Sequence, residues 1–130
     1  KLGKEELRID ENLHSTLLLP QGKDGPAFLA FKNFEVYLSW NDSFIYTVTA
    51  AHLAKRLAGA KKYIHRNPSD ILDIESMIQL QNLLKSKGYD VGKVDGILGA
   101  KTRQAVRLIQ LEFGLSADSW PTNDLLRKLQ

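Results

Sequence analysis

Residues 88–102 read GYDVGKVDGILGAKT and lie between two segments with helical periodicity. Four of these fifteen residues are glycine, which adopts positive φ without steric cost, so the sequence predicts a tight and fixed path. A flexible linker would be rich in Gly and Ser, whereas this stretch interleaves its glycines with apolar residues. Asp95-Gly96 is a turn pair whose carboxylate can accept hydrogen bonds from nearby backbone N–H groups. The residues expected to be buried are Tyr89, Val91, Val94, Ile97 and Leu98.

Three helices are expected around this loop. The first runs from about Asp73 to Lys87 and ends at Gly88, and the second runs from about Ala100 to Phe113. Thr122 is expected to cap a last short helix.

A weak internal repeat links these elements. Each unit has a helix carrying Gln, then a Gly, a loop with Asp, and a Thr at a helix start. Neither unit could bury its apolar face alone, so we expect them to pack as one small bundle, with chance similarity as the alternative. The markers are Leu80-Gln81, Gly88, Asp95 and Thr102 in the first unit, and Ile109-Gln110, Gly114, Asp118 and Thr122 in the second.

The N-terminal half is organised differently. Two short apolar runs, 17–20 and 27–31, flank a turn signature over residues 21–26 and predict a small β-hairpin. Residues 33–40 fit the strand period and a helix face nearly equally well. Residues 44–57 predict a helix capped by Ser43, and residues 60–72 read as a join broken near Pro68.

Composition narrows the possible functions. Hydrophobic residues at 43% and charged residues at 25% are ordinary globular values. The net charge of +3 is spread along the chain and does not demand nucleic acid. The absence of cysteine excludes disulfides and thiolate chemistry, and no apolar run is long enough to span a bilayer. The chain starts at Lys1 without an initiator Met or a signal peptide, so we suspect a piece of a longer precursor.

Residues 77–130 resemble the three-helix peptidoglycan-binding domain found on cell-wall hydrolases. The chain departs from the family at Asp118-Ser119, where a second Asp-Gly is usual, and at Ile109, where an aromatic residue is usual. Its second loop can therefore present a different ligand surface. The matching residues are Leu80-Gln81, Leu84, Gly88-Tyr89, Val94-Asp95-Gly96, Gly99, Thr102, Ala105-Val106, Gln110 and Gly114-Leu115.

Residues 7–59 resemble the C-terminal end of the catalytic domain of the membrane-bound lytic murein transglycosylase B type. This resemblance implies a helix at Asn33-Phe34, and the order of catalytic domain and then binding domain is a known family arrangement. The matching runs are Leu17-Leu18-Leu19-Pro20, Gly25-Pro26-Ala27-Phe28-Leu29, Asn33-Phe34, Trp40-Asn41, Ser43, Tyr46 and His52-Leu53-Ala54.

The resemblance implies a reaction and also a limit. Family members use one glutamate as general acid and then base, and the muramic acid 6-hydroxyl attacks to give a 1,6-anhydro sugar. That glutamate lies upstream of the matched runs, so no catalytic residue is expected in this chain. Glu35 falls at a variable position and is expected to be a solvated surface carboxylate.

Several side chains are candidate ligand contacts. Trp40, Asn41 and Tyr46 match positions that line the sugar cleft in the family, where rings stack on pyranoses and amides read N-acetyl groups. The alternative is that the two rings are core residues and Asn41 is a cap. We favour the cleft for Asn41 and Tyr46 and leave Trp40 open. In the binding domain the expected contacts are Tyr89, Lys93 and Trp120.

Other candidate residues are expected to be structural. Asp95, Gly96, Gly99 and Thr102 form the binding-domain signature. We expect Asp95 and Thr102 to tie the loop and cap the helix, and direct contact of these residues with the ligand is the less favoured alternative. The three histidines, at 14, 52 and 65, share no metal-ligand spacing. No metal and no cofactor is therefore expected.

The sequence thus predicts a mainly α chain. Residues 1–66 would be the C-terminal portion of a lysozyme-like catalytic domain with a small β-hairpin, 67–73 a linker, and 74–130 a three-helix peptidoglycan-binding bundle. The predicted function is peptidoglycan binding and cleft formation within a lytic murein transglycosylase of the periplasm or cell envelope. Its partners would be glycan strands or stem peptides and the upstream catalytic portion of the same precursor. The alternative is a non-enzymatic three-helix interaction module, such as a nucleic-acid binder, which the even charge distribution disfavours.

Overall fold

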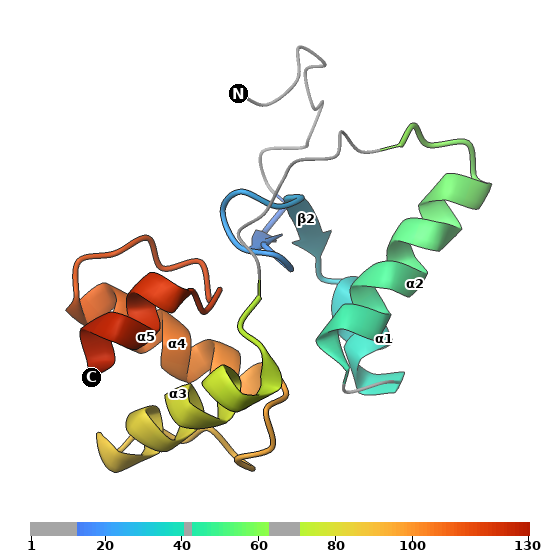
Figure 1. Ribbon diagram of the computed structural model, residues 1–130. Coiled ribbons are helices and arrows are strands. Elements are labelled where there is room, and N and C mark those ends of the chain that lie inside the picture. Colours follow the sequence, from blue (N-terminus) through green and yellow to red (C-terminus); the bar gives the residue numbers. More distant parts are fainter. Residues whose placement is uncertain (1–12, 41–42, 63–70) are drawn as a thin grey trace.

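A β-hairpin forms the first described part of the chain. The computed structural model describes residues 13–40, 43–62 and 71–130 (Figure 1). Strand β1 (Ser15–Leu18) pairs antiparallel with β2 (Phe28–Phe31), and Leu17 lies opposite Leu29. The intervening turn is closed by hydrogen bonds from Gly22 N to Leu19 O and from Gly25 N to Gly22 O, both 3.2 Å. The predicted hairpin is confirmed.

Two helices follow the hairpin. Helix α1 (Phe34–Trp40) resolves the ambiguous segment in favour of a helix. Helix α2 (Phe44–Leu57) has the predicted bounds, and Ser43 caps it by accepting a hydrogen bond from Tyr46 N at 3.4 Å. Within α2 only Thr47 and Val48 are buried. These two helices therefore contribute little core of their own among the described residues.

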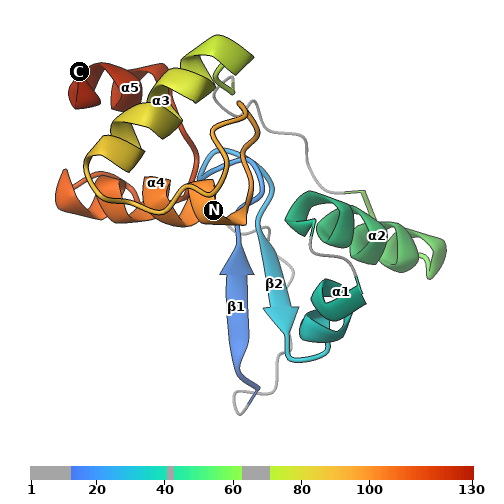
Figure 2. The same ribbon diagram turned by 90° about the horizontal axis from the view of Figure 1, so that it is seen from below.

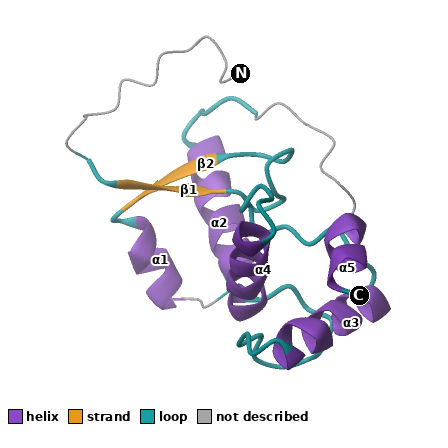
Figure 3. Ribbon diagram, turned by 90° about the vertical axis from the view of Figure 1, so that its left-hand side faces the viewer, coloured by secondary structure: helices purple, strands orange, loops and turns teal. Residues whose placement is uncertain are grey.

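The C-terminal part is a bundle of three helices, α3 (Ile74–Ser86), α4 (Ala100–Glu112) and α5 (Asn123–Leu129). The apolar faces of all three meet in one core, and burying each large aliphatic side chain contributes roughly 1.5–3 kcal/mol. Loops connect the three helices (Figure 3). The most deeply buried apolar residues of the core are Met77, Leu80, Leu84, Val106, Ile109 and Leu125.

The helix ends follow from local chemistry. Asp73 caps α3 by accepting from Ser76 N at 2.7 Å, and Thr122 caps α5 by accepting from Leu125 N at 3.2 Å. Gly88 and Gly114 follow α3 and α4 with φ of +91° and +64°, as C′ glycines do. The prediction that Thr102 caps α4 is wrong. The N-cap is Gly99, and Thr102 lies inside the first turn.

The loop over residues 88–102 is only partly buried. Val91 is 4% exposed, while Tyr89, Val94 and Leu98 are half-buried against the core. The expected burial of Ile97 is wrong, because its side chain is 66% exposed. The loop is held by polar bonds as well as by apolar contacts, so it does not need every apolar side chain inside.

The hairpin lies between the α3–α5 bundle on one side and α1 and α2 on the other (Figures 1 and 2). Its turn reaches the bundle, while β2 leads directly into α1. Every helix within the described ranges is too short or too polar to cross a bilayer.

Candidate functional site

A buried glutamine organises the loop over residues 88–102. Gln81 lies on α3 and is fully buried. Its Oε1 atom accepts hydrogen bonds from Asp95 N and Gly96 N, at 3.1 and 2.9 Å. Its Nε2 atom donates to Lys93 O and Ile97 O, at 3.3 and 3.1 Å. Because each unpaired buried polar group costs about 1–3 kcal/mol, these bonds fix the loop to the helix.

Asp95 and Thr102 complete this network. Asp95 Oδ1 accepts from Ile97 N at 2.9 Å. Thr102 Oγ1 accepts from Gln81 Nε2 and donates to Val91 O, both at 3.2 Å. Both side chains are thus engaged in holding the loop.

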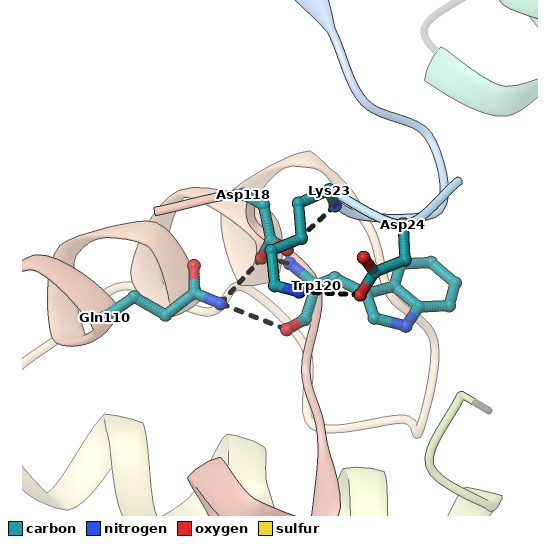
Figure 4. A network of polar contacts seen from close by, with 5 residues as sticks. All are labelled: Lys23, Asp24, Gln110, Asp118 and Trp120. Atoms are coloured by element: carbon teal, nitrogen blue, oxygen red, sulfur yellow. Dashed lines mark hydrogen bonds and ion pairs between the residues drawn. The ribbon is translucent and has the colours of Figure 1, made fainter. Parts of the chain in front are cut away.

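Gln110 repeats the arrangement one helix later (Figure 4). Its Nε2 atom donates to Asp118 Oδ1 at 2.8 Å and to Trp120 O at 3.1 Å. Its Oε1 atom accepts from Ser119 N at 3.0 Å, and Asp118 Oδ1 accepts from Trp120 N at 3.0 Å. Ser119 has a φ of +62° where Gly96 has +77°. The internal repeat is therefore structural, and Ser119 occupies a left-handed position that glycine fills in the first loop.

The second loop also binds the hairpin turn. Asp118 Oδ2 accepts from Lys23 N at 2.9 Å, so one carboxylate joins segments 95 residues apart. Gly22 packs so closely that a Cβ atom there would lie 2.7 Å from Trp120 Cβ. Arg103 Nη2 also donates to Pro20 O at 2.9 Å. We call these contacts between residues 20–23 and the residues Arg103, Asp118 and Trp120 the seam.

Arg103 is the unexpected residue of the seam. It lies on α4 and is only 9% exposed. Its guanidinium carbon lies 5.2 Å from the ring centre of Phe44 and 5.7 Å from that of Trp120, so two aromatic faces receive the cation. Burial lowers the pKa of Arg103, and its Nε atom is buried without a hydrogen-bond partner among the described residues. The side chain connects the hairpin turn, α2 and the second loop.

An open pocket of about 620 Å³ lies beside the seam. Residues 21–24 of the hairpin turn form one wall, and residues of the second loop and α5 form the other. Both signs of charge line it. Lys23 pairs with Asp24 at 2.7 Å, and this bond raises the pKa of Lys23. Arg127 pairs with Asp124 on the opposite wall.

Of the predicted cleft residues, the structure describes the side chain of Tyr46, and it does not line this pocket. Tyr46 sits in the first turn of α2 and is 50% exposed. Trp40 ends α1, and nothing is described of its side chain, while Asn41 lies outside the described residues. Glu35 is exposed on the first turn of α1, as expected.

The predicted contacts of the binding domain are dispersed. Tyr89 donates from its hydroxyl to Glu112 Oε2 at 2.6 Å, which raises the pKa of Tyr89, and Lys93 is exposed. Trp120 lines the pocket but is 8% exposed, so its ring serves mainly in packing. Neither Tyr89 nor Lys93 lines the pocket.

The sequence predicted Trp120 as a ligand contact, but it indicated no role for Lys23 or Arg103 or for the other charged residues of the pocket wall. Asp118 and Gln110 were available as repeat markers, and their positions matched Asp95 and Gln81. Nothing in the sequence pointed to Lys23 or Arg103, because a basic residue is expected at the surface.

In the part of the chain that the structure describes, no three His, Asp or Glu side chains lie close enough together to hold a metal ion. His14 is exposed, and the His52 ring lies edge-on to Phe28 with 5.7 Å between ring centres. His65 lies outside the described residues.

Two protein families match this chain in succession. Residues 2–55 match the family described as a transglycosylase SLT domain, and residues 74–129 match the family described as a peptidoglycan binding domain. The spore cortex-lytic enzyme of Bacillus cereus is 48% identical over 44 residues, which are 34% of this chain and 17% of that enzyme.

Solved structures also resemble the chain. SltB3 from Pseudomonas aeruginosa, in complex with NAG-anhNAM-pentapeptide, is 39% identical with a TM-score of 0.71 and covers 93% of this chain. The same protein with NAG-NAM-pentapeptide is 38% identical, covers 94% and has the same TM-score. The chain spans 34% of the length of SltB3. The predicted fold class is confirmed: a mainly helical chain with a hairpin, resembling a lysozyme-like transglycosylase portion followed by a peptidoglycan-binding bundle.

Proposed function

We propose that this chain is the peptidoglycan-binding and cleft-forming part of a lytic murein transglycosylase of the periplasm or cell envelope. The observation that carries the proposal is the succession of the two family matches, residues 2–55 and then 74–129, along one chain. The likeness to SltB3 over nearly the whole chain supports it. The domain division would be 1–66, 67–73 and 74–130, with residues 63–70 outside the described structure.

The exposed apolar side chains of α1 and α2 support a larger enzyme. Val36 is 69% exposed, Ile45 46%, Leu53 57% and Leu57 82%. These exposed apolar side chains are available for further structure to pack against α1 and α2. The upstream catalytic portion of the same precursor is the proposed occupant, and it would carry the glutamate that acts as general acid.

The seam gives the proposed enzyme a fixed geometry. Asp118 and Arg103 bind the hairpin turn directly, at 2.9 Å in both cases. A glycan strand held by the bundle would therefore reach the cleft in a defined orientation, which lowers the entropic cost of reaction. Asn41 and Tyr46 are the proposed sugar contacts of that cleft.

Product analysis tests this function. A longer protein containing the upstream portion should release 1,6-anhydromuropeptides from purified peptidoglycan, and the 130-residue chain alone should release none. Release of reducing-end muropeptides by the longer protein would contradict the transglycosylase assignment. Release of 1,6-anhydro products by the isolated chain would show that the general acid lies within it.

A further inference from the structure

The pocket beside the seam is built from both matched regions. Lys23 and Asp24 come from the hairpin turn, in the region matching the transglycosylase family, and Asp124, Arg127 and Lys128 come from α5 of the bundle. The bond from Lys23 N to Asp118 Oδ2 and the close packing of Gly22 on Trp120 hold the two walls together. The pocket exists only because the hairpin turn docks on the second loop.

The lining of the pocket is charged rather than aromatic. The side chains of Lys23 and Asp24 are 57% and 50% exposed, and those of Arg127 and Asp124 are 74% and 80% exposed. Among the described residues that line the pocket, only Trp120 is aromatic, and it is 8% exposed. A sugar-stacking site needs an open ring face, which this pocket lacks.

The charges indicate which part of peptidoglycan would fit. The glycan strand is neutral, because the lactyl carboxyl group of muramic acid is consumed in the amide bond to the peptide. The stem peptide carries free carboxylates and, at its diamino acid, a free ammonium group. A ligand with both signs of charge matches walls that each hold a cation and an anion.

The existing ion pairs do not prevent such binding. Surface pairs such as Lys23–Asp24 and Arg127–Asp124 are weak, so their partners can exchange for ligand charges at little cost. Lys128 lines the pocket without an ion pair to any described residue, so it is available to a ligand carboxylate.

We infer that this composite pocket binds the zwitterionic stem peptide of peptidoglycan, with Lys128 and Arg127 facing its carboxylates and Asp24 and Asp124 facing its ammonium group. The inference rests on the proposed function and deepens it, since it names the part of peptidoglycan that is recognised. It also makes recognition depend on the docking of the hairpin turn.

Calorimetric titration of the full 130-residue chain tests the inference with two soluble probes. One is a synthetic stem tetrapeptide that contains diaminopimelate and is acylated at its N-terminus, and the other is a GlcNAc–MurNAc oligosaccharide whose lactyl carboxyl groups are capped as neutral amides. The double variant Arg127→Ala/Lys128→Ala should weaken tetrapeptide binding by about tenfold, and rising salt should weaken it in the wild type. The matched control is Lys85→Ala/Lys87→Ala, which removes the same charge from exposed positions outside the lining.

The outcomes separate this inference from the proposed function. Equal tetrapeptide affinity in the double variant and in the control overturns the inference, as does binding of the oligosaccharide but not of the tetrapeptide. In both cases sedimentation of the chain with insoluble peptidoglycan would leave the proposed function standing. A chain that binds neither probe and does not sediment with peptidoglycan overturns both.

Discussion

At the scale of single residues, two buried glutamines do the same work in two loops. Gln81 and Gln110 are 0% and 5% exposed, and each uses both ends of its amide on an Asp-centred turn. A glutamine is suited to this task because its amide donates and accepts in one plane. Each loop is therefore held in place by a side chain of the helix that precedes it.

Replacement of Gln81 by leucine should be severe. It leaves Asp95 N, Gly96 N and two loop carbonyls without partners near a buried site, so we expect a loss of roughly 3 kcal/mol in the free energy of unfolding. Urea denaturation measures this loss. Asn82→Leu, at an exposed position on the same helix, is the control and should lose little. Equal stability of the two variants would contradict the role given to Gln81.

Two glycines of the loop should respond differently to alanine. Gly96 has a φ of +77°, and a Cβ atom there would lie 2.7 Å from Ile74 Cγ2, so Gly96→Ala should cost about 2 kcal/mol or more. Gly99 has a φ of −80° and open space around its Cβ position, so Gly99→Ala should cost only about 0.5–1 kcal/mol, the difference between glycine and alanine as N-caps. Thermal unfolding followed by circular dichroism compares them, and a larger loss at Gly99 would refute this geometry.

At the scale of elements, helix ends are where sequence and structure agree best. Ser43, Asp73 and Thr122 each cap the helix that follows them. A carboxylate at such an end is also favoured by the helix dipole. The hydrogen bond from Ser76 N is the main cause that lowers the pKa of Asp73 below its ordinary value of 3.8.

The cap of α3 should make stability depend on pH. Because the pKa of Asp73 is lower in the folded state, its contribution is complete above the ordinary value of 3.8 and is lost as pH falls through the folded value. Asp73→Asn keeps a capping oxygen but cannot titrate. Melting temperatures of the wild type and Asp73→Asn should therefore diverge near neutral pH and converge on acidification. A constant difference from neutral to acidic pH would argue against this account.

The elements that could be predicted were those with local signals. Ser43 marked the start of α2, and Asp95-Gly96 predicted a fixed turn. Thr102 was misplaced because a threonine near a helix start resembles a cap, whereas its hydroxyl binds Gln81. Ile97 was expected inside because composition does not reveal that polar bonds carry this loop. Residue type alone did not show that Thr102 bonds to Gln81 instead of capping α4, or that Ile97 is exposed.

At the scale of the whole molecule, the seam joins parts of the chain that carry no shared sequence signal. Lys23 and Asp118 are 95 residues apart, and no periodicity connects them. Arg103 could not be predicted in a buried site, since arginine is seldom buried without an acidic partner. The second turn lacks the Asp-Gly sequence that marks the first, because Ser119 takes the left-handed position that Gly96 takes in the first loop. The succession of two family matches was expected from the sequence, but the contact between the hairpin turn and the second loop was not.

Removal of the Arg103 cation should loosen the seam. Methionine cannot donate to Pro20 O, so amide exchange of Lys23 in Arg103→Met should accelerate about tenfold, which corresponds to about 1.4 kcal/mol of local stability. Amides of Val106 and Ile109 in the bundle core should keep their protection. Arg107→Met, at an exposed site one turn along α4, is the control. Unchanged exchange at Lys23 would show that Arg103 does not hold the hairpin turn.

Sedimentation with insoluble peptidoglycan tests the central claim most directly. We expect the 130-residue chain to enter the pellet and to lose this binding only gradually as salt rises, because a net charge of +3 spread along the chain and a few exposed ionic contacts give a shallow salt dependence. Duplex DNA offered in parallel should compete weakly. A chain that stays in the supernatant with peptidoglycan, and instead binds DNA with a steep loss of affinity as salt rises, would contradict the account.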